Sequence, residues 1–116
     1  MLADEFKIHV SDCPNGAVLV KLGGFLDAHT YERLDQAIAQ LFAEKRFRLI
    51  VDLAGVGYVS SAGAGVFIAA LTDAQDQKGN VVLLSPVANV REVLEMLGFN
   101  QIFKIALTLD EAMSAV

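Results

Sequence analysis

The chain has 116 residues, a length that suits one domain whose core needs neither disulfides nor metal. Hydrophobic residues make up 54% of the sequence, but polar side chains interrupt every apolar run before it could span a bilayer. The net charge of −5, with basic residues dispersed except at 45–48, argues against a nucleic-acid partner. We therefore expect a single soluble domain over residues 1–116, without membrane insertion. The first residues lack a signal-peptide pattern and Cys13 is the lone cysteine, which favours the reducing cytoplasm.

The N-terminal pattern predicts a β-hairpin followed by a helix. Apolar and polar residues alternate over 6–10, and turn residues at 14–16 separate this strand from a second at 17–22. After a glycine pair, apolar residues recur at helical spacing over about four turns. Asp27 or Thr30 is available to begin this helix.

The middle of the chain predicts two buried strands joined by a helix. Residues 49–53 form an apolar run without alternation, as in a strand covered on both faces. A turn of small residues containing Ser60 and Ser61 follows, and a helix then runs to a stop near Gly79. Residues 81–84 form the next unbroken apolar strand.

The segment after this strand predicts a third helix. Ser85 fits the N-cap position and Pro86 the first helical position, while Gly98 ends the helix. Helical spacing predicts four residues that face the sheet: Val87, Val90, Leu94 and Leu97.

A last strand and a short helix complete the predicted order of elements. Residues 102–106 are expected to form the strand, and Thr108 and Glu111 have the spacing of a capping box before a helix at 109–116. The order is therefore β-β-α-β-α-β-α-β-α. It predicts an α/β fold with a mostly parallel sheet and an antiparallel N-terminal edge strand.

The serine pair is the most informative polar feature of the chain. At a helix start, unpaired N–H groups and the positive end of the helix dipole stabilise an oxygen acceptor, and a phosphate still more. Judged by the residues alone, simple N-capping is the favoured interpretation of Ser60 and Ser61, because serine is a preferred cap almost anywhere, and a phosphate site is the alternative.

Enzymatic sites that use a serine or a nucleotide lack their other parts. The glycine pattern of a nucleophile elbow is absent, and no histidine follows Ser61 to complete a triad. His9 and His29 are expected at the surface, without metal-ligating partners. The glycines form neither a dinucleotide fingerprint nor a Walker A loop, so we expect no cofactor and no metal.

A phospho-aspartate receiver domain is a closer alternative. Asp52, Ser85 and Lys104 are the residue types that such a domain places at strand ends. Its chemistry also needs an acidic pair that holds Mg²⁺ near the end of the first strand, and only Asp12 stands there. We therefore do not favour this alternative.

The serine turn, set in this order of elements, resembles the STAS domain family, and most of all its bacterial anti-sigma factor antagonists. Residues 51–66 are similar to the family pattern of aspartate, phosphorylatable serine, serine or threonine, glycine, any residue, glycine. The Gly24-x-x-Asp27 segment is a second match. In this register Ser61 occupies the phosphoacceptor position, Ser60 replaces the family's aspartate, and Ala62 replaces its second hydroxyl residue.

The resemblance implies a partner switch. The unmodified domain would bind an anti-sigma factor that is also a serine kinase, phosphorylation of Ser61 (less readily Ser60) would end the binding, and a serine phosphatase would restore it. In this mechanism ATP belongs to the kinase. Because the sequence shows no assembled acid, base or metal constellation, we expect this chain to be no enzyme and to need no cofactor. The expected partner-binding residues are Asp27, Ala28, His29, Thr30, Ser60, Ser61, Ala62 and Gly63. Capping of the first helix is the alternative role of Asp27.

A second function is compatible with the same fold. A non-phosphorylated STAS scaffold, as a subunit of a stress-sensing or lipid-transport complex, would use the same surface without modification of Ser61. The altered residues Ser60 and Ala62 keep this alternative open.

Overall fold

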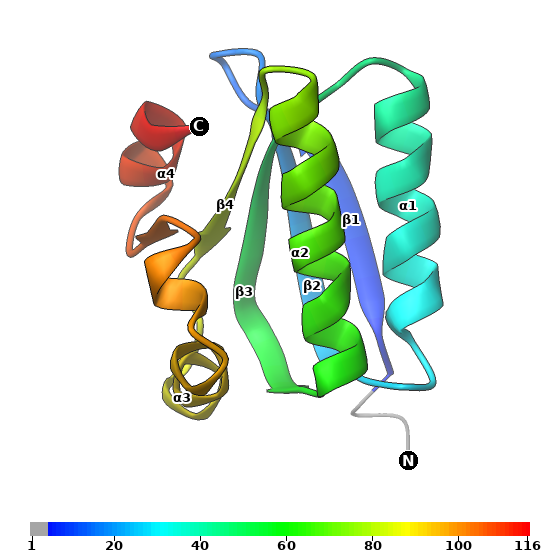
Figure 1. Ribbon diagram of the computed structural model, residues 1–116, viewed down its shortest axis with the longest axis vertical. Coiled ribbons are helices and arrows are strands. Elements are labelled where there is room, and N and C mark those ends of the chain that lie inside the picture. The colour runs from blue at the N-terminus through cyan, green and yellow to red at the C-terminus, as the bar shows by residue number, and fades with distance from the viewer. Residues whose placement is uncertain (1–4) are drawn as a thin grey trace.

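The strands lie side by side in the order in which they occur along the chain. The computed structural model describes residues 5–116, and its single sheet has the order β1-β2-β3-β4-β5 (Figure 1). Strands β1 and β2 pair in antiparallel orientation, and the other neighbouring strands pair in parallel. The elements are β1 (Lys7–Asp12), β2 (Val18–Leu26), α1 (Tyr31–Ala43), β3 (Arg48–Val59), α2 (Ser61–Asp76), β4 (Asn80–Leu84), α3 (Ala88–Met96), the 3₁₀ turn η1 (Phe99–Gln101), β5 (Ile105–Ala106) and α4 (Leu109–Ala115). The predicted order of strands and helices is confirmed. The segment used to argue against a signal peptide lies almost wholly outside the described residues.

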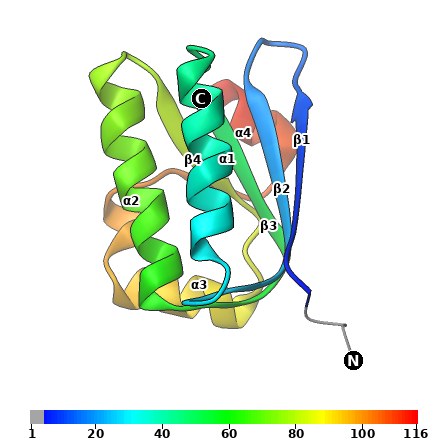
Figure 2. The ribbon, with the colours of Figure 1, turned by 90° about the vertical axis from the view of Figure 1, so that its right-hand side faces the viewer.

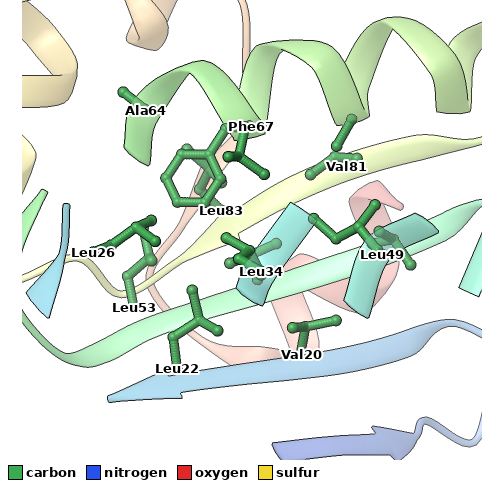
Figure 3. Packing of buried hydrophobic residues seen from close by; sticks show 14 of the residues in the cluster. Val20, Leu22, Leu26, Leu34, Leu49, Leu53, Ala64, Phe67, Val81 and Leu83 are labelled. Atoms are coloured by element: carbon green, nitrogen blue, oxygen red, sulfur yellow. The ribbon is translucent and has the colours of Figure 1, made fainter. Parts of the chain in front are cut away.

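The larger part of the core lies between the sheet and helices α1 and α2, which pack against each other on one face (Figure 2). Phe67 of α2 and Leu34 of α1 point toward side chains of β2, β3 and β4, as Figure 3 shows. A smaller cluster on the opposite face joins α4 to the sheet through Ile50, Val82 and Ala112. Strands 49–53 and 81–84 were expected to be buried on both faces, and these two clusters confirm it for their apolar residues.

Two strands run further than the sequence predicts. β2 continues through the glycine pair to Leu26, and β3 continues through the small residues to Val59. The turn of small residues expected directly after residue 53 is therefore wrong over 54–59, which are part of β3. Strand glycines mark bulges or close backbone approaches: the register shifts beside Gly24, which has φ +89°, and a Cβ on Gly55 would lie 3.0 Å from the Leu22 carbonyl oxygen.

The predicted start of the third helix is also wrong. Val87, not Ser85, is the N-cap of α3. The Ser85 N–H continues the sheet pairing with the Ala106 carbonyl, and the Ser85 hydroxyl donates to the Leu107 carbonyl at 2.9 Å. Because the helix begins later, only Val90 and Leu94 of the four expected residues are buried. Val87 and Leu97 are 37% and 43% exposed.

The last strand is shorter than predicted. Only Ile105–Ala106 pairs with β4, whereas the Phe103 N–H donates to the Phe99 carbonyl and keeps the preceding residues in a helical turn. The Phe99 and Phe103 rings lie 5.2 Å apart between their centroids, and both side chains are buried in the larger cluster. The burial of these rings stabilises the turn at the expense of strand pairing.

The short C-terminal helix begins at the predicted cap. The Glu111 N–H donates to the Thr108 hydroxyl at 3.1 Å, and the Glu111 carboxylate accepts from the Leu107 N–H at 2.9 Å. That backbone hydrogen bond, with help from Lys104 at 3.0 Å, lowers the pKa of the Glu111 carboxyl. Among residues 5–116, no helix combines the length and hydrophobicity needed to cross a bilayer.

Candidate functional site

Two of the predicted site segments meet at the carboxyl ends of β2 and β3. Leu26 and Val59 are partners in the parallel pairing, and the Ser60 N–H donates to the Leu26 carbonyl at 2.9 Å. Residues 27–30, which link β2 to α1, therefore emerge beside residues 60–63, which begin α2. Loops at the carboxyl ends of parallel strands are a common place for binding sites in α/β folds.

The two serines have different roles at the start of α2. Ser60 is the N-cap, and its hydroxyl oxygen accepts from the Gly63 N–H at 3.2 Å. Ser61 is the first helical residue, and its side chain is exposed. The first intrahelical bond runs from the Ala64 N–H to the Ser60 carbonyl at 2.8 Å, and the Ser60 hydroxyl takes the Gly63 N–H. The N–H groups of Ser61 and Ala62 are therefore left open. The structure therefore separates the capping hydroxyl from the accessible one.

Gly63 brings α2 close to the end of β2. A Cβ at this position would lie 2.6 Å from the Leu26 carbonyl oxygen and 2.7 Å from Leu26 Cγ, distances that real Cβ atoms do not tolerate. Gly63 is buried. Of the predicted partner-binding residues it is thus the one placed for packing, and it sets how Ser61 is presented.

Asp27 organises the turn that precedes α1. One of its carboxylate oxygens accepts from the His29 N–H at 2.9 Å and from the Thr30 hydroxyl at 3.3 Å. The Thr30 hydroxyl also accepts from the Asp27 N–H, and its one proton is shared between the Asp27 carboxylate and the nearer Phe25 carbonyl oxygen at 2.8 Å. Ala28 and His29 are exposed at the tip of this turn. Asp27 therefore has a structural role, although the N-cap residue of α1 is Thr30.

An aromatic pair beside these loops was not predicted from the sequence. Phe25 and Tyr58 are 37% and 47% exposed, and their ring centroids lie 6.0 Å apart in an edge-to-face arrangement. The Phe25 ring lies close to Gly57, whose carbonyl accepts from the Asn89 side chain of α3 at 2.8 Å. The signal in the sequence was an aromatic residue, Phe25 or Tyr58, one position before the end of each strand. The pairing was missed because residue 58 was expected in a turn.

Comparison with known proteins identifies the family. The STAS domain model matches residues 10–112. The chain belongs to the STAS domain family. The anti-sigma-F factor antagonist RsfB of Mycobacterium tuberculosis is 26% identical to this STAS domain over 113 residues, which cover 97% of this chain and 91% of RsfB.

Solved structures agree with this assignment. The crystal structure of an anti-sigma factor antagonist from Mycobacterium paratuberculosis superimposes on the STAS domain with a TM-score of 0.86 and 25% identity, covering 97% of this chain and 95% of the other. The Bacillus cell fate determinant SpoIIAA in its phosphorylated form has a TM-score of 0.74 and 20% identity, with 94% and 98% of the chains covered. The SpoIIAA likeness establishes the shared fold.

Proposed function

We propose that this STAS domain is an anti-sigma factor antagonist that works by partner switching, with Ser61 as its phosphorylated residue. In the unmodified state it binds an anti-sigma factor that is also a serine kinase, which frees the sigma factor. The observation that carries the proposal is the exposed Ser61 hydroxyl at the first position of α2, beside the loop of residues 27–30. The names of its relatives support the same class of function.

The proposed modification changes the charge of a surface that must lose water when the partner binds. The Ser61 Oγ gives up its proton and forms a bond to the γ-phosphorus of ATP held by the kinase, and ADP leaves. The new group carries about −1.5 to −2 charges at neutral pH. Desolvating that charge without a matched partner weakens the complex by several kcal/mol. A serine phosphatase removes the group and restores binding.

The start of α2 accommodates this charge without unfolding. The open N–H groups of Ser61 and Ala62 and the positive end of the α2 dipole both stabilise an anion there. No acidic residue lies in the first turn of this helix. Phosphorylation is therefore expected to change binding while the fold is retained.

Phosphorylation should occur at Ser61 and not at Ser60. The protein would be incubated with ATP and a serine kinase encoded beside its gene, followed by intact mass measurement and peptide mapping. One phosphoryl group on Ser61 is the expected result, because the Ser60 hydroxyl is engaged in the cap. Modification of Ser60 would show that the proposal names the wrong serine as the phosphoacceptor.

Asp27 should contribute to partner binding through its charge and to folding through its hydrogen bonds. Asp27→Asn keeps an oxygen that can accept from the His29 N–H, so the free energy of unfolding should stay within about 0.5 kcal/mol of the parent value. Its affinity for the kinase should nevertheless fall about tenfold. Asp27→Ala should lose the same affinity and about 1 kcal/mol of stability in addition.

Titrations and denaturant melts on the same samples test this division. An Asp27→Asn protein that binds the kinase as tightly as the parent would limit Asp27 to its structural role in the turn.

A non-phosphorylated scaffold is the second candidate function. It is favoured by Ser60 and Ala62, which stand where the family pattern has an aspartate and a second hydroxyl residue. A scaffold would bind its partner equally well with serine, alanine or glutamate at position 61. A complete absence of phosphorylation by the co-encoded kinase would favour this function.

A further inference from the structure

Part of the sheet face opposite α1 and α2 is uncovered over β1 and β2 (Figure 2). Ala17, just before β2, and Leu19, near its start, pack in the smaller cluster with residues of α4. Lys21 and Gly23 follow at two-residue spacing and so share a face with Leu19, but Lys21 is exposed and Gly23 is only half-buried. A shallow depression of about 250 Å³ lies at this place.

The floor of the depression is made by glycine backbone. The strand pairing places Lys7, Gly23 and Gly55 in one row across β1, β2 and β3. Gly23 and Gly55 line the depression and have no side chains that would fill it. Glycine allows a ligand to approach the backbone closely, and these two glycines leave the floor free of side chains where the β2–β3 register shifts between Lys21 and Gly23.

The rim of the depression carries positive charge. His9 and Lys21 pair across β1 and β2 in the next row, and with Lys7 they line the depression. Within residues 5–116 neither lysine takes part in an ion pair. Asp52 follows Lys21 in that row and offsets one of the two lysine charges, since the hydrogen bond from the Ala54 N–H at 3.0 Å does not neutralise its carboxylate. In the described part of the chain, the residues that line the depression include no acidic side chain, so a net positive charge remains at its rim.

These groups favour an anion in a protein whose net charge is −5. The aliphatic stems of the lysines supply apolar walls while their ammonium groups stay in water.

We propose that this depression binds a planar aromatic carboxylate. The ring lies on the glycine floor between the lysine stems, and the carboxylate accepts from the ammonium groups of Lys7 and Lys21. The His9 ring adds a flat surface and an N–H donor at the rim. None of these residues belongs to the segments around Ser61, so the inference does not depend on the partner switch.

The first test uses 2-naphthoate as the probe and its neutral amide, 2-naphthamide, as the matched ligand. Backbone amide signals would be followed by NMR during titration of the whole protein. We expect saturable shifts centred on Lys7, Lys21, Gly23 and Gly55, with a Kd of about 1 mM or tighter, and at least tenfold weaker binding of the amide. Equal binding of the two ligands, or shifts centred elsewhere, would overturn the proposal.

The second test uses variants that change charge and space separately. Lys7→Gln combined with Lys21→Gln should weaken 2-naphthoate binding at least tenfold, whereas Lys45→Gln, which removes the same kind of charge after α1, should leave it unchanged. Gly23→Leu should abolish binding by filling the floor. A Cβ on Gly23 meets only the Gly55 carbonyl oxygen, at 3.8 Å, so this variant is expected to fold.

A thermal melt of each variant confirms that the fold is intact before binding is compared. A folded Gly23→Leu protein that retains the parent affinity would refute the site. As a second space-filling variant, Gly23→Ala should weaken binding without abolishing it.

Discussion

Ser61→Glu should bind the kinase about a hundredfold more weakly than the parent, a loss of about 2–3 kcal/mol, while Ser61→Ala should bind as tightly as the parent and resist phosphorylation. The physical reason is that the glutamate carries its charge into a surface that docking desolvates. The folded state should tolerate the same charge. At the first position of α2 a carboxylate is stabilised by the helix dipole, by up to about 1 kcal/mol.

The neighbouring serine is the matched control for this experiment. Ser60→Ala removes the hydroxyl that accepts from the Gly63 N–H, so it should cost about 1 kcal/mol of unfolding free energy. Ser61→Ala should cost little, because the cap remains. Affinity and urea midpoint measured on all three variants separate switching from capping. Kinase binding by Ser61→Glu at the parent level would rule out a charge-operated switch at this position.

Gly63→Ala should destabilise the protein by about 2–3 kcal/mol, the largest stability loss that a single added methyl group is expected to cause in this site. Its Cβ would have to occupy space already taken by the Leu26 carbonyl and side chain. α2 would then have to move away from β2, straining a closely packed core.

A second glycine of the same helix is the natural control. Gly65 is two residues further along α2, it is exposed, and a Cβ there would meet nothing within 4 Å. Gly65→Ala should therefore stabilise the protein by about 0.5–1 kcal/mol through helix propensity. Urea denaturation of the two variants should give changes of opposite sign. A neutral Gly63→Ala would mean that α2 can adjust its position without cost.

The elements that follow from local physics were predictable. Residues 49–53 and 81–84 lack alternation because both of their faces are covered, and a doubly buried strand must be apolar throughout. The start of α2 was predictable for a similar reason, since Ser60 supplies a cap and the following apolar residues recur with the helical period.

The lengths of β2 and β3 depend on each other and could not be read locally. Residues 54–57 contain two glycines, which taken alone favour a turn. In the fold, β2 lies alongside and supplies hydrogen-bonding partners up to Val59, so the segment stays extended. The parallel partner lies more than thirty residues away along the chain. The contact between Gly63 and Leu26 was hidden for the same reason.

The misplaced start of α3 has a different cause. Ser85 and Pro86 satisfy every local rule for a helix start. A hydrogen bond to Leu107, a residue twenty-two positions later, holds the Ser85 hydroxyl instead. Ser85 also adopts φ +53°, in the left-handed region, whereas an N-cap residue is usually extended.

The strands lie in the sheet in the order in which they are translated, and this order affects how the chain can fold during synthesis by the ribosome. Every strand after the first has a hydrogen-bonding partner that was translated before it, since no later strand is inserted between two earlier ones. An emerging strand can therefore pair as soon as it leaves the exit tunnel, and N-terminal segments need not wait unpaired for the C-terminus. We expect the nascent chain to acquire protease resistance in steps that follow the completion of β3 and then β4.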